Sequence, residues 1–137
     1  MLRNNKNSTR KTRETAVSIR QMKSLKTPVI KSWDCAEHDP IEAWVPEDPS
    51  DVEFWCNIAI GIEGEVGADN FQVHIATQKA VSRTTSKEFL VVIPYYENWP
   101  QVLGVLQNMA AQCKGLDWTS MSEQLSARFK WEYEGMG

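Results

Sequence analysis

Few residues in this chain have the types and spacing that catalysis or metal binding would need. Cys35 and His38 stand three positions apart in CAEH, whereas His74, Cys56 and Cys113 each stand alone. A zinc site usually needs a second pair of ligands at similar spacing. Cys56 falls on the apolar face of a predicted strand, where burial makes a thiol inert. We therefore predict no metal site, no cofactor and no catalytic residue, with Cys56 and Cys113 in the core and His74 on the polar face of a strand.

The glycine-rich stretch at residues 61–67 does not have the composition of a phosphate-binding loop. It lacks the Lys and the Ser or Thr of a P-loop, and Glu63 and Glu65 within it would repel phosphate. With Asp69 they do not match the spacing of a known calcium loop, so we interpret the stretch as an exposed acidic hairpin tip. The chain has eighteen acids, which always offer pairs for acid–base chemistry, and nothing singles out one pair. A small enzyme with such a carboxylate is our third hypothesis.

Acidic residues are concentrated in one window, Ser32 to Gln78, which contains no Lys or Arg. Its eleven acids are Asp34, Glu37, Asp39, Glu42, Glu47, Asp48, Asp51, Glu53, Glu63, Glu65 and Asp69. Inside the window, Ile41, Trp44 and Val45 form a small apolar island. Trp44 has two interpretations: a plug that pins the loop to the body, or an interface anchor, because Trp is enriched at binding hot spots. The window predicts a rigid strand pair that presents negative charge to a cationic partner.

Charge divides the chain into two parts. Before Ser32 there are nine basic residues and one acid, a net of +8, and the remaining six basic and seventeen acidic residues give −11. Residues 1–15 are polar and basic, which predicts a flexible arm, and residues 16–137 then form one domain. An acidic body repels nucleic acid and anionic membranes and attracts basic proteins. A nucleic-acid-associated protein that binds through its basic N-terminal arm is the alternative hypothesis.

Other sequence features indicate the cellular compartment of the protein. No run approaches the ~18 apolar residues of a membrane span, and the N-terminus lacks the apolar region of a secretory signal. The three Cys are an odd number at wide spacings, which predicts reduced thiols in a cytoplasmic protein. The sequence does not predict an oligomeric state.

Alternating apolar residues predict a series of strands. We expect a first strand at Ala16–Leu25, ended by Thr27-Pro28, and a mostly irregular stretch at residues 29–50. The clearest strand is Phe54–Ile62, in which every second residue from Phe54 is apolar. Residues 71–77 alternate as its antiparallel partner. The run FLVVI at Phe89–Ile93 is apolar on both faces, which predicts a central or doubly covered strand.

Two helices and a short tail follow. Pro100 suits a first helical turn, Gly115 is placed as a C-cap, and the apolar residues between them recur at helical spacing. Asp117, or Ser120 with Glu123, can cap the second helix. The tail WEYE from Trp131 is either a short last strand or a frayed end. The predicted fold class is α+β: a small antiparallel sheet of about four strands with two C-terminal helices on one face.

The order of these motifs resembles a known family. VPEDP followed by FW, the pattern IGIEGEVGADNFQVHIAT and a tail with Cys113-Lys114-Gly115, Trp118 and WEYE are similar to the immunity protein 8 family of bacterial polymorphic-toxin and contact-dependent inhibition systems. The resemblance covers roughly residues 20–134. It implies a small α+β antitoxin, without enzymatic activity, that binds a toxin domain and blocks it. The family is paired with several toxin types, so membership does not name the toxin.

The acidic charge of the chain indicates what kind of toxin it binds. A toxin that cuts nucleic acid needs a cationic surface to hold phosphates, and a carboxylate-rich inhibitor can imitate phosphate charge and speed its own capture. We therefore expect a cationic toxin, with a nuclease as one candidate, and no nucleic acid or membrane as partner. The residues expected to contact the toxin are Glu42, Trp44, Glu47, Asp48, Asp51 and Glu53, followed by Glu63, Glu65 and Asp69.

Overall fold

The structure of the chain is a computed structural model that describes residues 24–132. The arm expected at residues 1–15 lies outside these residues, as does most of the strand expected at Ala16–Leu25. The last two residues of that expected strand, Ser24 and Leu25, are described and belong to no strand.

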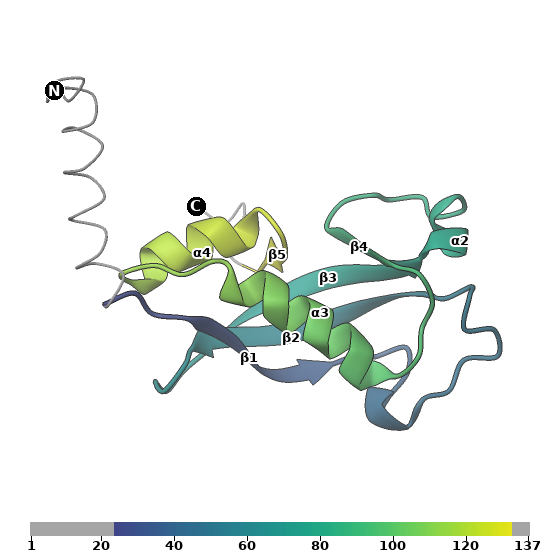
Figure 1. Cartoon of the computed structure of the whole chain (residues 1–137), viewed down its shortest axis with the longest axis horizontal. Helices are drawn as coiled ribbons and strands as arrows, with labels where there is room; N and C mark the ends of the chain where they lie inside the picture. The colour runs from purple at the N-terminus through teal and green to yellow at the C-terminus, as the bar shows by residue number, and fades with distance from the viewer. Residues whose placement is uncertain (1–23, 133–137) are drawn as a thin grey trace, which may run out of the picture.

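The described part of the chain forms a sheet with helices on one of its faces (Figure 1). The strands are β1 (Pro28–Asp34), β2 (Glu53–Ile62), β3 (Asp69–Thr77) and β4 (Leu90–Ile93), in the order β1-β2-β3-β4, and β5 (Lys130–Trp131) also pairs with β3. The helices are η1 (Ile41–Ala43), α2 (Gln78–Val81), α3 (Trp99–Ala111) and α4 (Trp118–Ser126). The predicted α+β class, with an antiparallel sheet of about four strands and two C-terminal helices, is confirmed.

The long hairpin of β2 and β3 follows the predicted alternation. Phe54, Cys56, Ile58 and Ile60 are at most 1% exposed and face the helices, together with Phe71 from β3. The two strands are antiparallel, with Cys56 opposite Val73 and Ile58 opposite Phe71. At the hairpin tip Gly64 and Gly67 have φ of 84° and 104°, a conformation that other residues rarely adopt. The hairpin predicted from the sequence is therefore present, with its acidic tip exposed.

The first strand of the sheet lies where the sequence predicts irregular structure. Residues 29–50 were expected to be mostly irregular, but β1 begins at Pro28 and pairs antiparallel with β2. A bulge between Ile30 and Ser32 breaks the alternation, so Ile30 and Trp33, three apart, lie opposite Ile60 and Ile58. Pro28 is tolerated because it is the first residue of an edge strand. On the outer edge, the Gln107 side chain of α3 hydrogen-bonds both the N–H and the C=O of Ile30.

The strand from the FLVVI run also differs from the prediction. β4 lies at the edge of the sheet rather than in its centre, and it is parallel to β3, with Ile75 opposite Val91. Val91 and Ile93 are buried, whereas Val92 is 43% exposed. The run is apolar on both faces, but only one face is covered.

The two C-terminal helices begin as predicted. Pro100 is in the first turn of α3, where the side chain of Asn98 accepts a hydrogen bond from the N–H of Gln101. Asp117 caps α4 by accepting from the N–H of Ser120. Gly115 is not the C-cap of α3, which is Gln112; it instead forms a β-bridge with Lys26. None of the helices in residues 24–132 is long and apolar enough to cross a membrane.

Cys35 and Cys56 form a disulfide, so the expectation of reduced thiols is wrong for this pair. Asp34 lies opposite Asn57 in the β1–β2 pairing, so the next residue, Cys35, comes opposite Cys56, with 4.4 Å between their Cα atoms. This separation is within the range that a disulfide spans. The sequence does not reveal the pair, because the bulge after Ile30 hides the alternation of β1. Cys113 is free and buried, as expected of a core residue.

Candidate interaction surface

The structure places the nine residues expected to contact a partner at two opposite ends of the sheet. Six lie in or directly after the acidic loop, which we define as residues 35–52 between β1 and β2. The other three lie at the opposite end: Glu63 and Glu65 in the turn between β2 and β3, and Asp69 at the first position of β3. The ten residues of β2 separate the two groups by about 30 Å (Figure 1). The nine residues therefore do not form one continuous patch.

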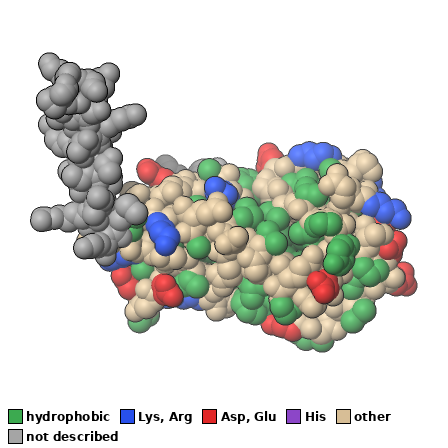
Figure 2. Space-filling view, viewed as in Figure 1, with side chains coloured by type: hydrophobic (Ala, Val, Ile, Leu, Met, Phe, Trp, Pro, Cys, Tyr) green, Lys and Arg blue, Asp and Glu red, His purple; other side chains and the backbone are tan. Residues whose placement is uncertain are grey.

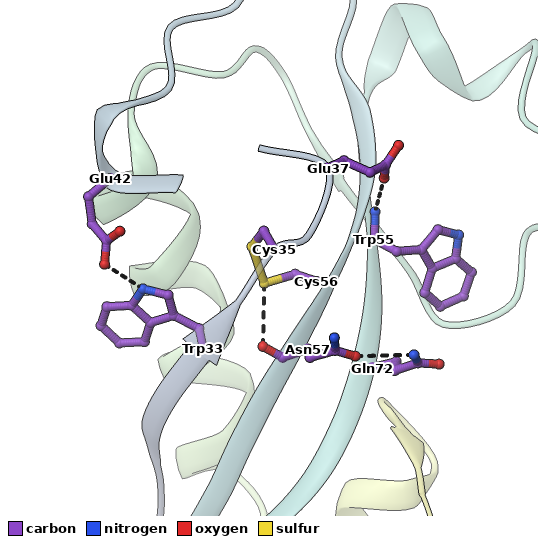
Figure 3. Close-up of a disulfide and its surroundings, with 8 residues drawn as sticks. All are labelled: Trp33, Cys35, Glu37, Glu42, Trp55, Cys56, Asn57 and Gln72. Atoms are coloured by element: carbon purple, nitrogen blue, oxygen red, sulfur yellow. Dashed lines mark hydrogen bonds between the residues drawn. A yellow bond between two sulfur atoms is a disulfide. The ribbon is translucent and has the colours of Figure 1, made fainter. Parts of the chain in front are cut away.

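The acidic loop is fixed to the sheet at its start. Figure 3 shows the Cys35–Cys56 disulfide between two hydrogen bonds that involve Trp residues. Trp33 Nε1 donates to Glu42 Oε2 over 2.7 Å, and the backbone N–H of Trp55 donates to Glu37 Oε1 over 3.2 Å. These contacts hold both the first turn of the loop and the Glu42 carboxylate in place.

Trp44 acts as the plug of the loop. Its ring stacks on His38 with 3.7 Å between centroids, and it contacts Phe54 and Tyr96 edge-on at 5.8 and 5.0 Å. The side chain is half-buried and packs against the main hydrophobic core. Burial, together with the nearby Glu42 carboxylate, raises the pKa of Tyr96. Of the two interpretations of Trp44, the contacts support the plug.

Two acids of the loop already have cationic partners. Asp48 lies 3.6 Å from Lys79 of α2, and Asp51 pairs with Arg83. Asp48 also accepts hydrogen bonds from the hydroxyl and the N–H of Ser50, and these bonds hold the pKa of its carboxyl below the ordinary 3.8. Glu47 is exposed and, within residues 24–132, has no ion pair. The loop therefore has free carboxylates as well as paired ones.

Glu53 has a structural partner. Its Oε2 lies 2.7 Å from Nε2 of His74, which is 1% exposed. The His74 ring stacks on Trp55 with 4.6 Å between centroids. His74 shares a face with Gln72, as predicted, but it is covered by Trp55 and is not in contact with solvent. Glu53 thus pairs with Nε2 of a buried imidazole, in addition to bordering the loop.

The hairpin acids are also partly engaged. Glu65 forms an ion pair with Lys26 at 3.0 Å. Asp69 Oδ2 accepts hydrogen bonds from Nε1 of Trp118 at 2.9 Å and Nε1 of Trp131 at 3.3 Å, so it joins the hairpin to α4 and β5. Glu63 is exposed. Asp69 therefore has a clear structural role.

The face of the sheet away from α3 and α4 has a polar row. Asp34, Asn57, Gln72 and Lys130 lie opposite one another in successive strands, and Gln72 donates to Asn57 over 3.1 Å (Figure 3). They line a hollow of about 530 Å³. The row carries one acid and one base, and Glu132 also lines the hollow, so this face has far fewer acids than the acidic loop.

Some exposed residues at the loop end were not selected from the sequence. Val45, part of the apolar island, is 81% exposed, and Tyr95 is 50% exposed. Glu97 is exposed beside Tyr95. The backbone N–H of Tyr96 donates to the C=O of Pro49 over 2.8 Å, which fixes this segment to the acidic loop. This hydrogen bond and the contact between the rings of Trp44 and Tyr96 are long-range contacts that place residues 95–97 beside the acidic loop, and the sequence has no signal for either.

In the described part of the chain, no group of three or more His, Cys, Asp or Glu could hold a metal ion. His38 contacts Trp44 and Phe54. Burial raises the pKa of the Cys113 thiol, an effect that Arg128 partly opposes. The alternative of nucleic-acid binding through residues 1–15 concerns a segment outside the described residues.

Comparison with known protein families decides the class of the protein. The model of the family described as immunity protein 8 matches residues 28–136, which is most of the chain. The chain belongs to the immunity protein 8 family. It is therefore an immunity protein, whose partner is a toxin. Comparisons with curated proteins and with solved structures gave no match.

Proposed function

We propose that this immunity protein neutralises its toxin by binding, without turnover, and that the acidic loop is the surface that binds. The toxin surface that it covers is cationic, the kind of surface with which a nuclease holds phosphates. Binding there excludes the substrate of the toxin. A cytoplasmic location is part of the same proposal, and it no longer rests on reduced thiols, because Cys35 and Cys56 form a disulfide.

One observation carries the proposal: the acidic loop is anchored to the sheet by the disulfide and by Trp33, and it still exposes carboxylates without cationic partners. Glu42 is exposed and oriented by Trp33, and Glu47 is exposed and unpaired among the described residues. Fixed charges of one sign raise the association rate for an oppositely charged protein, and this gain decreases with salt. The hairpin tip has less free charge because Glu65 and Asp69 have partners.

Charge reversal in matched pairs tests the proposal. The probe is the toxin domain encoded beside the gene of this chain, and its association rate is measured at several salt concentrations. Glu42→Lys/Glu47→Lys changes the loop, and Glu63→Lys/Glu65→Lys changes the hairpin tip. Glu88→Lys/Glu123→Lys is the control. It makes the same change in net charge at exposed positions outside the acidic loop and the hairpin tip.

The expected result is a loss of about tenfold or more in association rate at low salt for the loop pair alone. A similar loss for all three pairs would show an effect of net charge without a defined site. A loss confined to the hairpin pair would move the interface to the other end of the sheet. A wild-type protein that neither binds the toxin domain nor protects cells from it would refute the proposed function itself.

A further inference from the structure

Two large side chains at the loop end are exposed although they are not charged. Val45 is 81% exposed and Tyr95 is 50% exposed. Single exposed apolar side chains are common on protein surfaces, so the surroundings of these two decide whether they form a site. Figure 2 shows hydrophobic and acidic side chains next to one another at the end of the molecule that carries the acidic loop and α2.

The two segments that carry these side chains are fixed to each other. Trp44, next to Val45, has its ring 5.0 Å from the ring of Tyr96, which is next to Tyr95. The N–H of Tyr96 donates to the C=O of Pro49 over 2.8 Å. A standard interface of about 800 Å² per partner is a disc roughly 30 Å across, so one partner can contact both segments.

The second segment, residues 95–97, is also held by the side chain of Gln101. Gln101 Nε2 donates to the C=O of Tyr95 over 2.8 Å, and Gln101 Oε1 accepts from the N–H of Glu97 over 2.7 Å. The acidic loop is held in a similar way by the disulfide and by Trp33 and Trp44. Segments that are ordered before binding lose less conformational entropy in the complex.

Charge indicates what kind of partner fits. Lys79 and Arg83 compensate Asp48 and Asp51 on one side of the loop. Glu42, Glu47 and Glu97 are exposed and have no ion pair within residues 24–132. Uncompensated carboxylates around apolar side chains are complementary to an apolar group flanked by Lys or Arg.

We propose that Val45 and Tyr95 form the apolar centre of the surface that contacts the toxin domain, with Glu42, Glu47 and Glu97 at its rim. The partner then presents an apolar group surrounded by Lys or Arg. This inference depends on the proposed function, and it adds residues 95–97 to a surface that the sequence placed in the acidic window alone. The centre supplies most of the binding energy by excluding water, and the rim supplies speed and selectivity.

Truncation of the two central side chains tests the inference. Val45→Ser and Tyr95→Ala are compared with Val66→Ser and Leu116→Ala, which remove apolar side chains that are 104% and 46% exposed elsewhere on the molecule. The dissociation constant for the toxin domain encoded beside this gene is measured for each variant. All four positions are exposed, so the variants are expected to keep the wild-type melting temperature, which is measured as well.

The expected result is an increase of about tenfold or more in the dissociation constant for each of Val45→Ser and Tyr95→Ala, mainly through faster dissociation. The two controls should bind like the wild type. Normal binding by Val45→Ser and Tyr95→Ala would overturn the inference while leaving the proposed function in place. Weak binding by Val66→Ser instead would place the apolar centre at the hairpin. Absence of binding by the wild type would overturn both.

Discussion

At the scale of single residues, the acids of this protein have two roles. Some stabilise the fold: Asp69 holds two indole N–H groups, and Glu53 holds a buried imidazole. Others, such as Glu47, are exposed and unpaired in the part of the chain that is described. A mutation at the first kind is expected to change stability, and a mutation at the second kind only binding.

Glu53 provides a test of the first role. His74 is 1% exposed, and its Nε2 has Glu53 as hydrogen-bond partner. Glu53→Ala leaves a buried polar group unpaired, which costs about 1–3 kcal/mol of unfolding free energy. Glu53→Gln retains an acceptor and should cost less. Urea denaturation measures both, with the exposed Glu123→Ala as control; equal stability of Glu53→Ala and Glu123→Ala would exclude a structural role for this pair.

Asp48 provides a test through its titration. Hydrogen bonds from Ser50, with a smaller contribution from Lys79, lower its pKa from 3.8. A lowered folded-state pKa favours the ionised form, so this contribution is present above the unfolded pKa and is lost as pH falls through the folded pKa. Ser50→Ala should therefore raise the pKa of Asp48 toward 3.8, as measured by NMR titration of its carboxyl carbon. An unchanged pKa of Asp48 in Ser50→Ala would show that the Ser50 hydroxyl does not stabilise the ionised carboxyl.

The sequence shows where the acids are concentrated, but not which of them are engaged: Asp51, Glu53 and Asp69 are only partly exposed. The partners are distant along the chain: Arg83 for Asp51, and Trp118 for Asp69, 49 positions away. No local pattern encodes such pairs. Tyr95 and Glu97 are not predictable for the same reason, because their segment joins the acidic loop through long-range contacts of Tyr96 with Pro49 and Trp44.

At the scale of elements, regular alternation made β2 and β3 predictable, and irregularity hid β1. The bulge after Ile30 places Ile30 and Trp33 on one face, three positions apart, which is not a strand pattern. Without β1, the register that brings Cys35 opposite Cys56 could not be known. Where the acidic loop begins, directly after β1, is therefore visible only in the structure.

The disulfide leads to a prediction about this loop. Cys35 and Cys56 enclose a loop with a sequence separation of 21, and closing a loop of this size stabilises a protein by about 3 kcal/mol in the chain-entropy estimate. Protein purified without reductant should expose one reactive thiol in denaturant, Cys113, and reduction should expose all three. Reduction should also lower the unfolding free energy by about that amount. Three reactive thiols before reduction would contradict the disulfide.

At the scale of the whole molecule, the sheet separates the acidic loop at one end from the acidic hairpin tip at the other. The family match and the α+β class were predictable from the order of motifs, because strands β2 and β3 and both C-terminal helices have clear signals. The sequence window from Ser32 to Gln78 appeared as one acidic surface, whereas the strand between its two halves separates them by about 30 Å. One-dimensional charge density could not show that separation.

The most direct test of the account is a hydrogen-exchange footprint of the complex between this chain and the toxin domain encoded beside its gene. The account predicts slower amide exchange in the complex at residues 41–51 and 95–97, with no change at the hairpin tip, residues 63–68. Protection at the hairpin tip, or on the polar row around Asn57 and Gln72, with the acidic loop unchanged, would contradict it.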